Sequence, residues 1–137
     1  MDNRTLGNHF EQDFCEILFD NGFWTHNMAQ NQSGQPADVI AVKNHKAYLI
    51  DCKVCSGKGF PLDRIEPNQD TAMDLWRDCG NGEGWFALRI EGHEDIMMIP
   101  HFNMKAYRND PYRKSKTLSL EEIHESGVPL CKWLKKK

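Results

Sequence analysis

The chain has 137 residues, 39% of them hydrophobic and 27% charged, which is the length and composition of one globular domain with its own core. No stretch approaches the roughly 20 apolar residues of a membrane span, and the N-terminus lacks the build of a secretory signal, so we expect neither a membrane protein nor a secreted one. The net charge of −3 is uneven, because residues 1–104 hold 8 Lys and Arg against 16 Asp and Glu, whereas residues 105–137 hold 9 against 4. This division suits a protein that binds cations in one place and phosphates in another, although a solvated lysine tail would explain part of it.

The first half of the chain predicts a helix, a strand and a hairpin. Apolar residues recur at helical spacing over 4–20, and an Asn-Gly pair ends that helix. A strand near 23–29 follows, and after it comes a polar loop. Two apolar runs, 37–42 and 47–52, are separated by only four polar residues, so they should form an antiparallel hairpin.

The second half predicts a helix between further strands. A loop over 56–61 leads to a helix near 67–79, and strands near 85–90 and 95–99 precede a short helix near 101–107. The buried side of the helix near 67–79 is expected to hold Ala72, Met73, Leu75, Trp76 and Cys79. The order αβββαββ predicts an α/β (α+β) fold in which helices flank a mixed central sheet.

The hairpin brings two carboxylates together. If it closes symmetrically about Asn44 and His45, Asp38 lies directly opposite Asp51, with Cβ atoms about 4.5–5.5 Å apart. Strand alternation places Lys53 on the face of Asp51, roughly 6.6 Å further along. The other side chains of both faces are apolar, so both strands belong inside the sheet. A two- or four-residue loop gives this register, whereas a three-residue loop with a bulge would not.

Two opposed carboxylates need a positive charge close by, because like charges facing each other destabilise a sheet. Lys53 supplies one charge, and a divalent cation would supply two more. Ligands that are all oxygen favour Mg²⁺, with Mn²⁺ as a substitute, over zinc. The alternative is a plain ion pair between Asp51 and Lys53 at the end of a strand, which leaves Asp38 unexplained.

The first helix adds a third acid. Glu11 lies within about 40° of Cys15 and Leu18 on the helical wheel, inside the apolar arc. The other acids of this helix cluster on its solvent side: Asp13, Glu16 and Asp20. Glu11 is therefore the acid directed at the core, unless it sits at the edge of the apolar stripe and reaches water.

Acids gathered around Mg²⁺ beside a lysine are suited to hydrolysing a phosphodiester. Asp38 and Asp51 would bind the metal, with the backbone carbonyl of Cys52 as a third ligand. Lys53 would orient the attacking water or neutralise charge that develops on the phosphate. Glu11 would lie at a second metal or hold a metal-bound water. The sequence thus predicts a metal-dependent enzyme that hydrolyses phosphodiesters.

These residues resemble the PD-(D/E)xK nuclease signature, with Pro36-Ala37-Asp38, twelve residues, and then Asp51-Cys52-Lys53. Gly7-x-x-x-Glu11 is similar to the opening of Holliday-junction resolvases of this superfamily. Phe60-Pro61-Leu62-x-Arg64-Ile65-x-x-x-Gln69 is similar to the stretch after the catalytic lysine in RecU-type bacterial resolvases. The resemblance runs from Gly7 to about Pro100, with a weaker echo over 118–132.

The resemblance implies a restriction-endonuclease-like αβββαβ core and a Mg²⁺-dependent homodimer that nicks four-way DNA junctions symmetrically in recombination or repair. Gln69 opens the second helix, where free backbone N–H groups favour phosphate oxygens, so it could contact DNA or a water of the active site; the alternative is an ordinary residue of the helix N-terminus. Two departures stand out: Asp51 takes the place of the usual Glu, and only residues 30–35 fill the place of the long RecU stalk. Ser33 in that loop resembles the serine-bearing loop of archaeal resolvases.

Several further residues are expected to contact DNA. Lys58 and Arg64 flank the loop after the hairpin, and Lys114 and Lys116 lie in the basic C-terminal extension, residues 105–137. Together with Ser33 they would hold phosphates without reading base sequence. Residues 1–137 are then one nuclease domain, with a catalytic core over 1–104 and this extension.

Other interpretations compete with the resolvase. Cys52-x-x-Cys55 lacks the further ligands of a zinc site, and His93 and His101 are isolated and expected to be structural. Five cysteines, an odd number, indicate reduced thiols. With neither a membrane span nor a secretory signal in the sequence, we expect a cytoplasmic protein, whose host could be a bacterium or one of its viruses. The main alternatives are a restriction- or repair-type nuclease on the same fold and a DNA-binding protein that does not cut.

Overall fold

The computed structural model describes residues 3–28 and 37–137. A six-stranded sheet forms its centre, with strands in the order β1-β2-β3-β5-β6-β8, and a separate two-stranded sheet joins β4 to β7. The elements in chain order are α1 (Asn3–Asp20), β1 (Trp24–Asn27), β2 (Val39–Lys43), β3 (Lys46–Cys55), β4 (Phe60–Pro61), the 3₁₀ helix η1 (Leu62–Arg64), α2 (Pro67–Asp78), β5 (Trp85–Ile90), β6 (Ile96–Pro100), α3 (His101–Asn109), β7 (Thr117–Leu118), α4 (Leu120–Ser126), β8 (Val128–Pro129) and α5 (Leu130–Lys135).

The central sheet is mixed, as the sequence predicts. Strands β3 and β5 run parallel, and every other neighbouring pair in this sheet runs antiparallel. A parallel pair needs a long crossover connection, which the segment from β4 through α2 supplies. The strand and helix order of the first 107 residues follows the prediction, with the short β4 and η1 added in the loop after β3.

The hairpin of β2 and β3 closes in the predicted register. Its turn is Asn44-His45, and both residues have left-handed backbone angles, with φ of 53° and 65°. Positive φ at both central residues is the geometry of the tight hairpin turn whose twist matches that of the flanking strands. Val39 then pairs with Ile50, and Val42 pairs with Ala47. The same register, extended by one residue, sets Asp38 opposite Asp51 at the open end of the hairpin.

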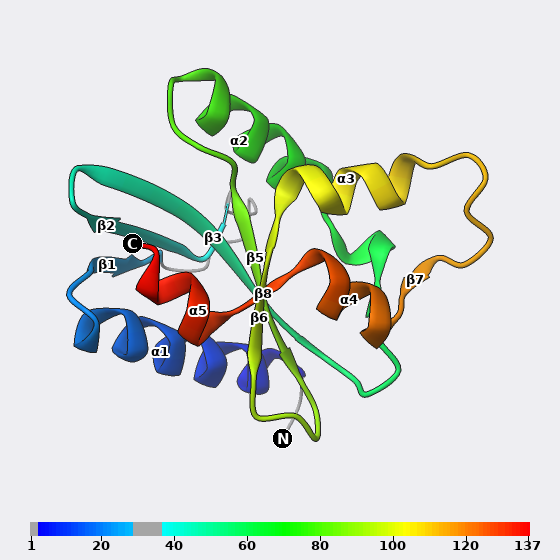
Figure 1. The fold of residues 1–137 in the computed structure, drawn as a ribbon, viewed down its shortest axis with the longest axis horizontal. Helices are drawn as coiled ribbons and strands as arrows, with labels where there is room; N and C mark the ends of the chain where they lie inside the picture. The colour runs from blue at the N-terminus through cyan, green and yellow to red at the C-terminus, as the bar shows by residue number, and fades with distance from the viewer. Residues whose placement is uncertain (1–2, 29–36) are drawn as a thin grey trace.

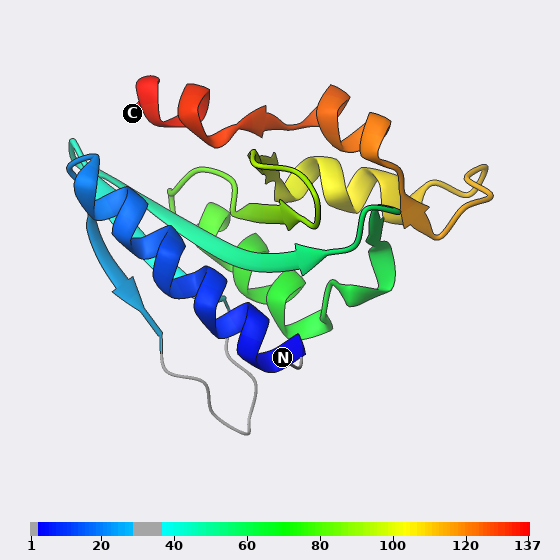
Figure 2. The same cartoon turned by 90° about the horizontal axis from the view of Figure 1, so that it is seen from below.

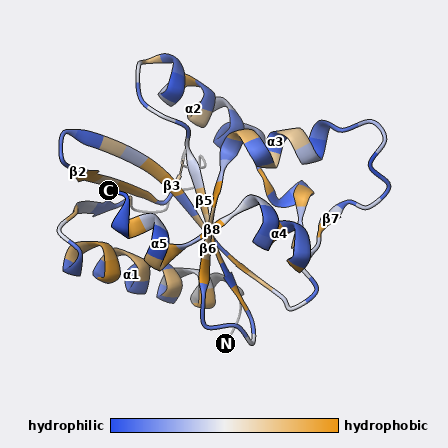
Figure 3. Ribbon diagram, in the orientation of Figure 1, coloured by the Kyte–Doolittle hydropathy of each residue, from blue (hydrophilic) through white to orange (hydrophobic). Residues whose placement is uncertain are grey.

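Helices cover both faces of the sheet, so the sheet separates two apolar cores. On one face, α1 and α5 enclose a cluster that includes Phe10, Phe14 and Trp133. On the other face, α2, α3 and α4 contribute Met73, Met104 and Ile123 to a second cluster. Figure 1 shows the two groups of helices on opposite sides of the strands, and Figure 2 shows α1 running beside the long strand β3. Figure 3 shows that the segment between α3 and β7 is largely hydrophilic.

The buried side predicted for α2 is partly wrong. Met73 is fully buried, but Leu75 is 62% exposed and Cys79 is exposed as well. The helix meets the core through a narrow stripe that includes Gln69 and Met73. On the neighbouring face of α2, Asp70 binds His101 and Asp74 binds Lys105, so this face contacts α3 through polar side chains.

The C-terminal segment packs on the sheet, although the sequence pattern predicts no helix or strand after residue 107. Strand β8 pairs with β6, and α5 inserts Trp133 into the core beside α1. The indole of Trp133 lies 5.2 Å from the ring of Tyr48 and 5.7 Å from that of Trp85, centroid to centroid. Lys137 Nζ lies 5.1 to 5.5 Å from the centroids of these three rings. None of the described helices is long and apolar enough to cross a bilayer.

We expect Gly59→Ala to destabilise the fold by about 2–4 kcal/mol, measured by urea unfolding. Gly59 has φ of +119°, and a Cβ there would lie 2.1 Å from the carbonyl oxygen of Leu118, where β4 meets β7. Gly92→Ala is the control, because Gly92 also has positive φ (+81°) but faces open space. It should cost roughly 1 kcal/mol. Equal losses at the two positions would contradict the proposed close contact between β4 and β7.

Candidate active site

Asp38 and Asp51 meet at the open end of the hairpin, where the sequence predicts them. The backbone N–H of Asp38 donates to the carbonyl of Ile50 (3.2 Å), which carries the pairing one residue beyond β2. The carboxylate of Asp38 reaches across to β3 and accepts a hydrogen bond from the backbone N–H of Cys52 (2.8 Å). Asp38 is 7% exposed and Asp51 is fully buried. Two acids that would be expected on a surface thus share one buried position.

Lys53 and Gln69 are the polar partners of Asp51. Lys53 Nζ lies 3.1 Å from Asp51 Oδ2, at ion-pair distance, and the lysine side chain is 13% exposed. Gln69 is buried at the start of α2 and donates from Nε2 to Asp51 Oδ1 (3.0 Å). Its Oε1 accepts the backbone N–H of Glu66 (3.3 Å), so the same side chain also caps the helix. The structure thus joins Asp38, Asp51, Lys53 and Gln69 in one cluster.

Burial raises the pKa of Asp51 well above the usual range of a carboxyl group. The charge of Asp38 raises this pKa further, and the ammonium of Lys53 opposes both effects. The pKa of the neighbouring Cys52 thiol is also raised well above its usual value, first by burial and then by Asp38, Asp51 and Glu11. The positive charge of Lys53 therefore does not fully offset the cost of ionising both aspartates at this buried position.

Glu11 lies at the edge of this cluster. It is 6% exposed on α1, as the helical wheel predicts, whereas Asp13 and Glu16 are exposed. The pKa of the half-buried Cys15 thiol is raised to about 11 by burial, then by Glu11 and Asp38, so these two carboxylates act on one thiol from α1 and from the hairpin. Glu11 thus contributes to the same negative field as the aspartate pair.

The donor set fits a divalent cation of the magnesium type. The Oδ2 atom of Asp51 is buried, and Lys53 Nζ is the cation at ion-pair distance from it in the described segments. Across residues 3–28 and 37–137, no three His, Cys, Asp or Glu side chains stand close enough to hold a metal by themselves. Mg²⁺ characteristically takes one or two carboxylates and keeps several waters, so the two aspartates are sufficient. A zinc site of four side-chain ligands does not fit this arrangement.

Two of the predicted phosphate contacts, Arg64 and Lys116, lie on distant segments that meet in the fold. Strand β4 pairs with β7, and the backbone N–H of Leu62 donates to the carbonyl of Lys116 (2.9 Å). The exposed Lys116 therefore lies beside the segment that carries Arg64, whose guanidinium donates to the carbonyl of Val54 (2.7 Å). The side chains of Lys58 and Lys114 are also exposed. Ser33 lies outside the described residues.

The partner of His101 could not be predicted from the sequence. This histidine was expected to be structural and isolated, but its imidazole is fully buried and Nε2 lies 2.6 Å from Asp70 Oδ1. Asp70 follows Gln69 directly in α2. No local sequence signal could have found this pair, because its two residues are 31 positions apart and meet only when α3 docks on α2.

The comparisons with known proteins agree with the fold. The family model of the archaeal Holliday junction resolvases (Hjc) matches residues 2–133. Among solved structures, the Hjc of Archaeoglobus fulgidus, a Holliday junction resolvase from an archaeal hyperthermophile, superposes with a TM-score of 0.64 and 19% sequence identity. The alignment covers 93% of this chain and 99% of that one. No curated protein matches significantly.

We expect Asp51→Asn to stabilise the metal-free protein at neutral pH, by on the order of 1 kcal/mol. Because the pKa of Asp51 is raised by folding, the folded protein keeps a proton that the unfolded chain has already released. Stability is therefore lost as the pH rises from the ordinary carboxyl pKa through the raised one. Urea unfolding in EDTA between pH 4 and 8 should show a gap between variant and wild type that widens with pH. Asp13→Asn, at an exposed position on α1, should show no such gap. An Asp51→Asn variant that is less stable than the wild type at neutral pH would contradict a raised pKa of Asp51 in the folded protein.

Proposed function

The chain belongs to the archaeal Holliday junction resolvase (Hjc) family, and we propose that its reaction centre is the cluster of Asp38, Asp51 and Lys53. It is accordingly a nuclease that resolves Holliday junctions, and resolvases of this family use a divalent metal. The observation that carries the proposed centre is the buried pair of aspartates with a lysine 3.1 Å from one of them. The narrower likeness to RecU-type enzymes rests on residues 60–69 and stays a prediction, since the matching family is the archaeal one.

We propose Mg²⁺ as the natural cation, with Mn²⁺ as a substitute. Asp38, Asp51 and the backbone carbonyl of Cys52 would hold it. When bound, the cation supplies charge to the scissile phosphate and lowers the pKa of the attacking water. The all-oxygen donors and the raised pKa of Asp51 support this choice, because a cation would let both carboxylates ionise.

Lys53, Glu11 and Gln69 take different parts in the reaction. The ammonium of Lys53 neutralises charge that develops on the phosphate and orients the attacking water. Glu11 acts through water at the edge of the cluster, in keeping with its 6% exposure. Gln69 fixes Asp51 Oδ1 by a hydrogen bond and so determines where the second carboxylate oxygen points. The burial of all these groups strengthens their electrostatic effect on a bound phosphate.

DNA would lie across the cations that β4 and β7 bring together. Lys58, Arg64, Lys114 and Lys116 would contact phosphates, with Ser33 as a further contact. We also propose that residues 1–137 form a single domain, because β8 of the C-terminal extension completes the central sheet. A cytoplasmic location is supported by the five free cysteines.

Substitution of the central residues should abolish cutting and spare binding. We expect Asp38→Asn and Lys53→Ala each to lower the single-turnover rate of junction cleavage by at least about 100-fold. Glu11→Gln should lower it by about 10-fold or more, whereas the control Glu16→Gln, an exposed acid of the same helix, should leave it unchanged. The assay is nicking of a synthetic four-way junction in Mg²⁺, with gel-shift measurement of affinity. Tight binding by the wild type with no cutting in Mg²⁺ or Mn²⁺ would defeat the proposal.

The proposed phosphate contacts should respond to salt. Lys114→Ala and Lys116→Ala should each weaken junction binding and reduce the slope of log affinity against log salt by about 1. Lys132→Ala is the control, since Lys132 is an exposed cation on α5, on the other side of the sheet. Titrations between low and physiological salt measure the slopes. If the slope of log affinity against log salt were unchanged in both the Lys114→Ala and the Lys116→Ala variants, these lysines would not contact DNA phosphates.

We propose that the active form is a homodimer, because paired nicks on a four-way junction match a two-fold enzyme. Sedimentation should give the mass of two chains. Mixing wild type with the inactive Asp38→Asn chain should produce junctions nicked in one strand only. A monomeric mass in the presence of a junction, together with unpaired nicks by the wild type, would contradict the dimer.

A further inference from the structure

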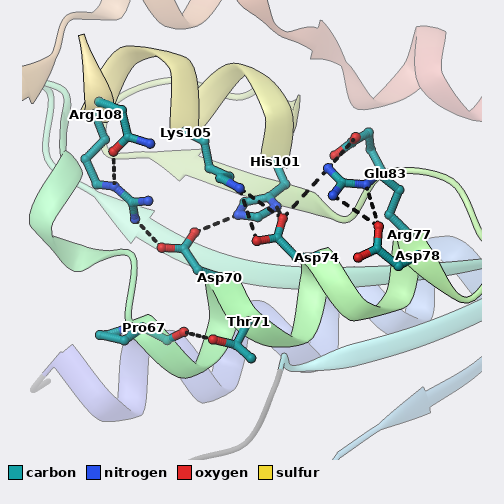
Figure 4. A network of polar contacts seen from close by, with 11 residues as sticks. Pro67, Asp70, Thr71, Asp74, Arg77, Asp78, Glu83, His101, Lys105 and Arg108 are labelled. Carbon is teal, nitrogen blue, oxygen red and sulfur yellow. Dashed lines mark hydrogen bonds and ion pairs between the residues drawn. The ribbon is translucent and has the colours of Figure 1, made fainter. Parts of the chain in front are cut away.

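A ladder of charged side chains joins α2 to α3 beside the active-site cluster. On α2, Asp70 and Asp74 are one turn apart, and both point toward α3 (Figure 4). On α3, the facing residues are His101, Lys105 and Arg108. Asp70 binds His101 through Oδ1 (2.6 Å) and Arg108 through Oδ2, and Asp74 binds Lys105 Nζ at 3.0 and 3.1 Å. Asp70 directly follows Gln69 in α2, so the ladder ends one residue away from the side chain that hydrogen-bonds Asp51.

His101 is anchored to the strands that carry the active site. Its backbone N–H donates to the carbonyl of Gly84 (2.8 Å), immediately before β5. Its ring lies against Phe86, 6.0 Å between centroids, and Phe86 is the residue of β5 that pairs with Asp51 of β3. The imidazole is completely buried, so its bond to Asp70 is shielded from water on the side of the histidine. His101 thus links the β3–β5 pair to the start of α2.

We propose that His101 and Asp70 are positioning residues that fix the start of α2 and thereby hold Gln69 against Asp51. The contacts form a closed circuit: Asp51 binds Gln69, the next residue binds His101, and His101 packs on the strand partner of Asp51. Gln69 Nε2 is the hydrogen-bond donor that orients the Asp51 carboxylate, and a shift of α2 along its axis would move it directly. This proposal rests on the proposed function of the Asp38–Asp51 pair as the metal site.

The solvent end of the same ladder provides an internal control. Arg77 contacts Asp74 (3.8 Å), Asp78 (3.2 Å) and Glu83 (3.5 Å), two turns further along α2 from Gln69. These three acids lie on α2 and in the segment after it, so the printed contacts of Arg77 do not bridge to α3. If loss of any charge on α2 impaired cleavage simply by weakening the helix, loss of Arg77 and loss of His101 should act alike. If the ladder positions Gln69, only the end next to Gln69 should affect cleavage.

The experiment measures single-turnover cleavage of a prebound four-way junction at varied Mg²⁺. We expect His101→Leu and Asp70→Asn to lower the saturating rate about 10-fold and to raise the Mg²⁺ concentration for half-maximal rate several-fold. Junction affinity should change less than about two-fold. His101→Gln should recover most of the rate, because its Nε2 can replace that of histidine toward Asp70. Arg77→Ala should match the wild type.

The variants are then combined with Gln69→Ala. Because the ladder acts through Gln69, His101→Leu or Asp70→Asn in that background should lower the rate by no more than about two-fold further. Full additivity with Gln69→Ala would overturn the proposal, as would an Arg77→Ala defect of equal size. Should His101→Leu fail to fold, Asp70→Asn, at a partly exposed site, decides the question. A wild type that does not cut would instead refute the proposed function.

Discussion

Two carboxylates that face each other across neighbouring strands repel, and burial strengthens that repulsion because water no longer screens it. Asp38 and Asp51 are held in this position by the tight turn at Asn44-His45, since a hairpin of this type allows no other register. The charge of Lys53 and the amide of Gln69 offset only part of the cost, and the pKa of Asp51 stays well above its usual range. Folding thus retains a destabilising carboxylate pair, and under the proposed function a divalent cation would relieve the repulsion.

The surrounding elements hold this pair in place. Strand β3 lies between β2 and β5, so the aspartates are carried by the interior of the sheet and not by a mobile edge. Helix α1 brings Glu11 from one face, and α2 brings Gln69 from the other. The short sheet of β4 and β7 joins the segment after the active site to the basic C-terminal extension. Under the proposed function, the metal site, the phosphate contacts and the residues that position Asp51 would therefore all belong to one packed structure.

The sequence predicts what depends on local periodicity and short-range pairing. The helix of Glu11, the hairpin register that opposes Asp38 to Asp51, and the mixed sheet all follow from patterns within one element or between neighbours in the chain. The prediction for α2 was wrong at Leu75 because amphipathic periodicity cannot tell an apolar neighbour from a polar one. The C-terminal elements and the pair of Asp70 with His101 depend on contacts between distant segments, which a single sequence does not encode locally.

The most direct test of the metal site is anomalous diffraction from crystals soaked in Mn²⁺. A manganese peak should lie about 2.0–2.2 Å from one carboxylate oxygen of Asp38 and one of Asp51. Crystals of Asp51→Asn, soaked in the same way, should lose that peak. A manganese ion bound elsewhere, or an Asp38–Asp51 pair that stays metal-free in saturating Mn²⁺ with DNA bound, would contradict the account.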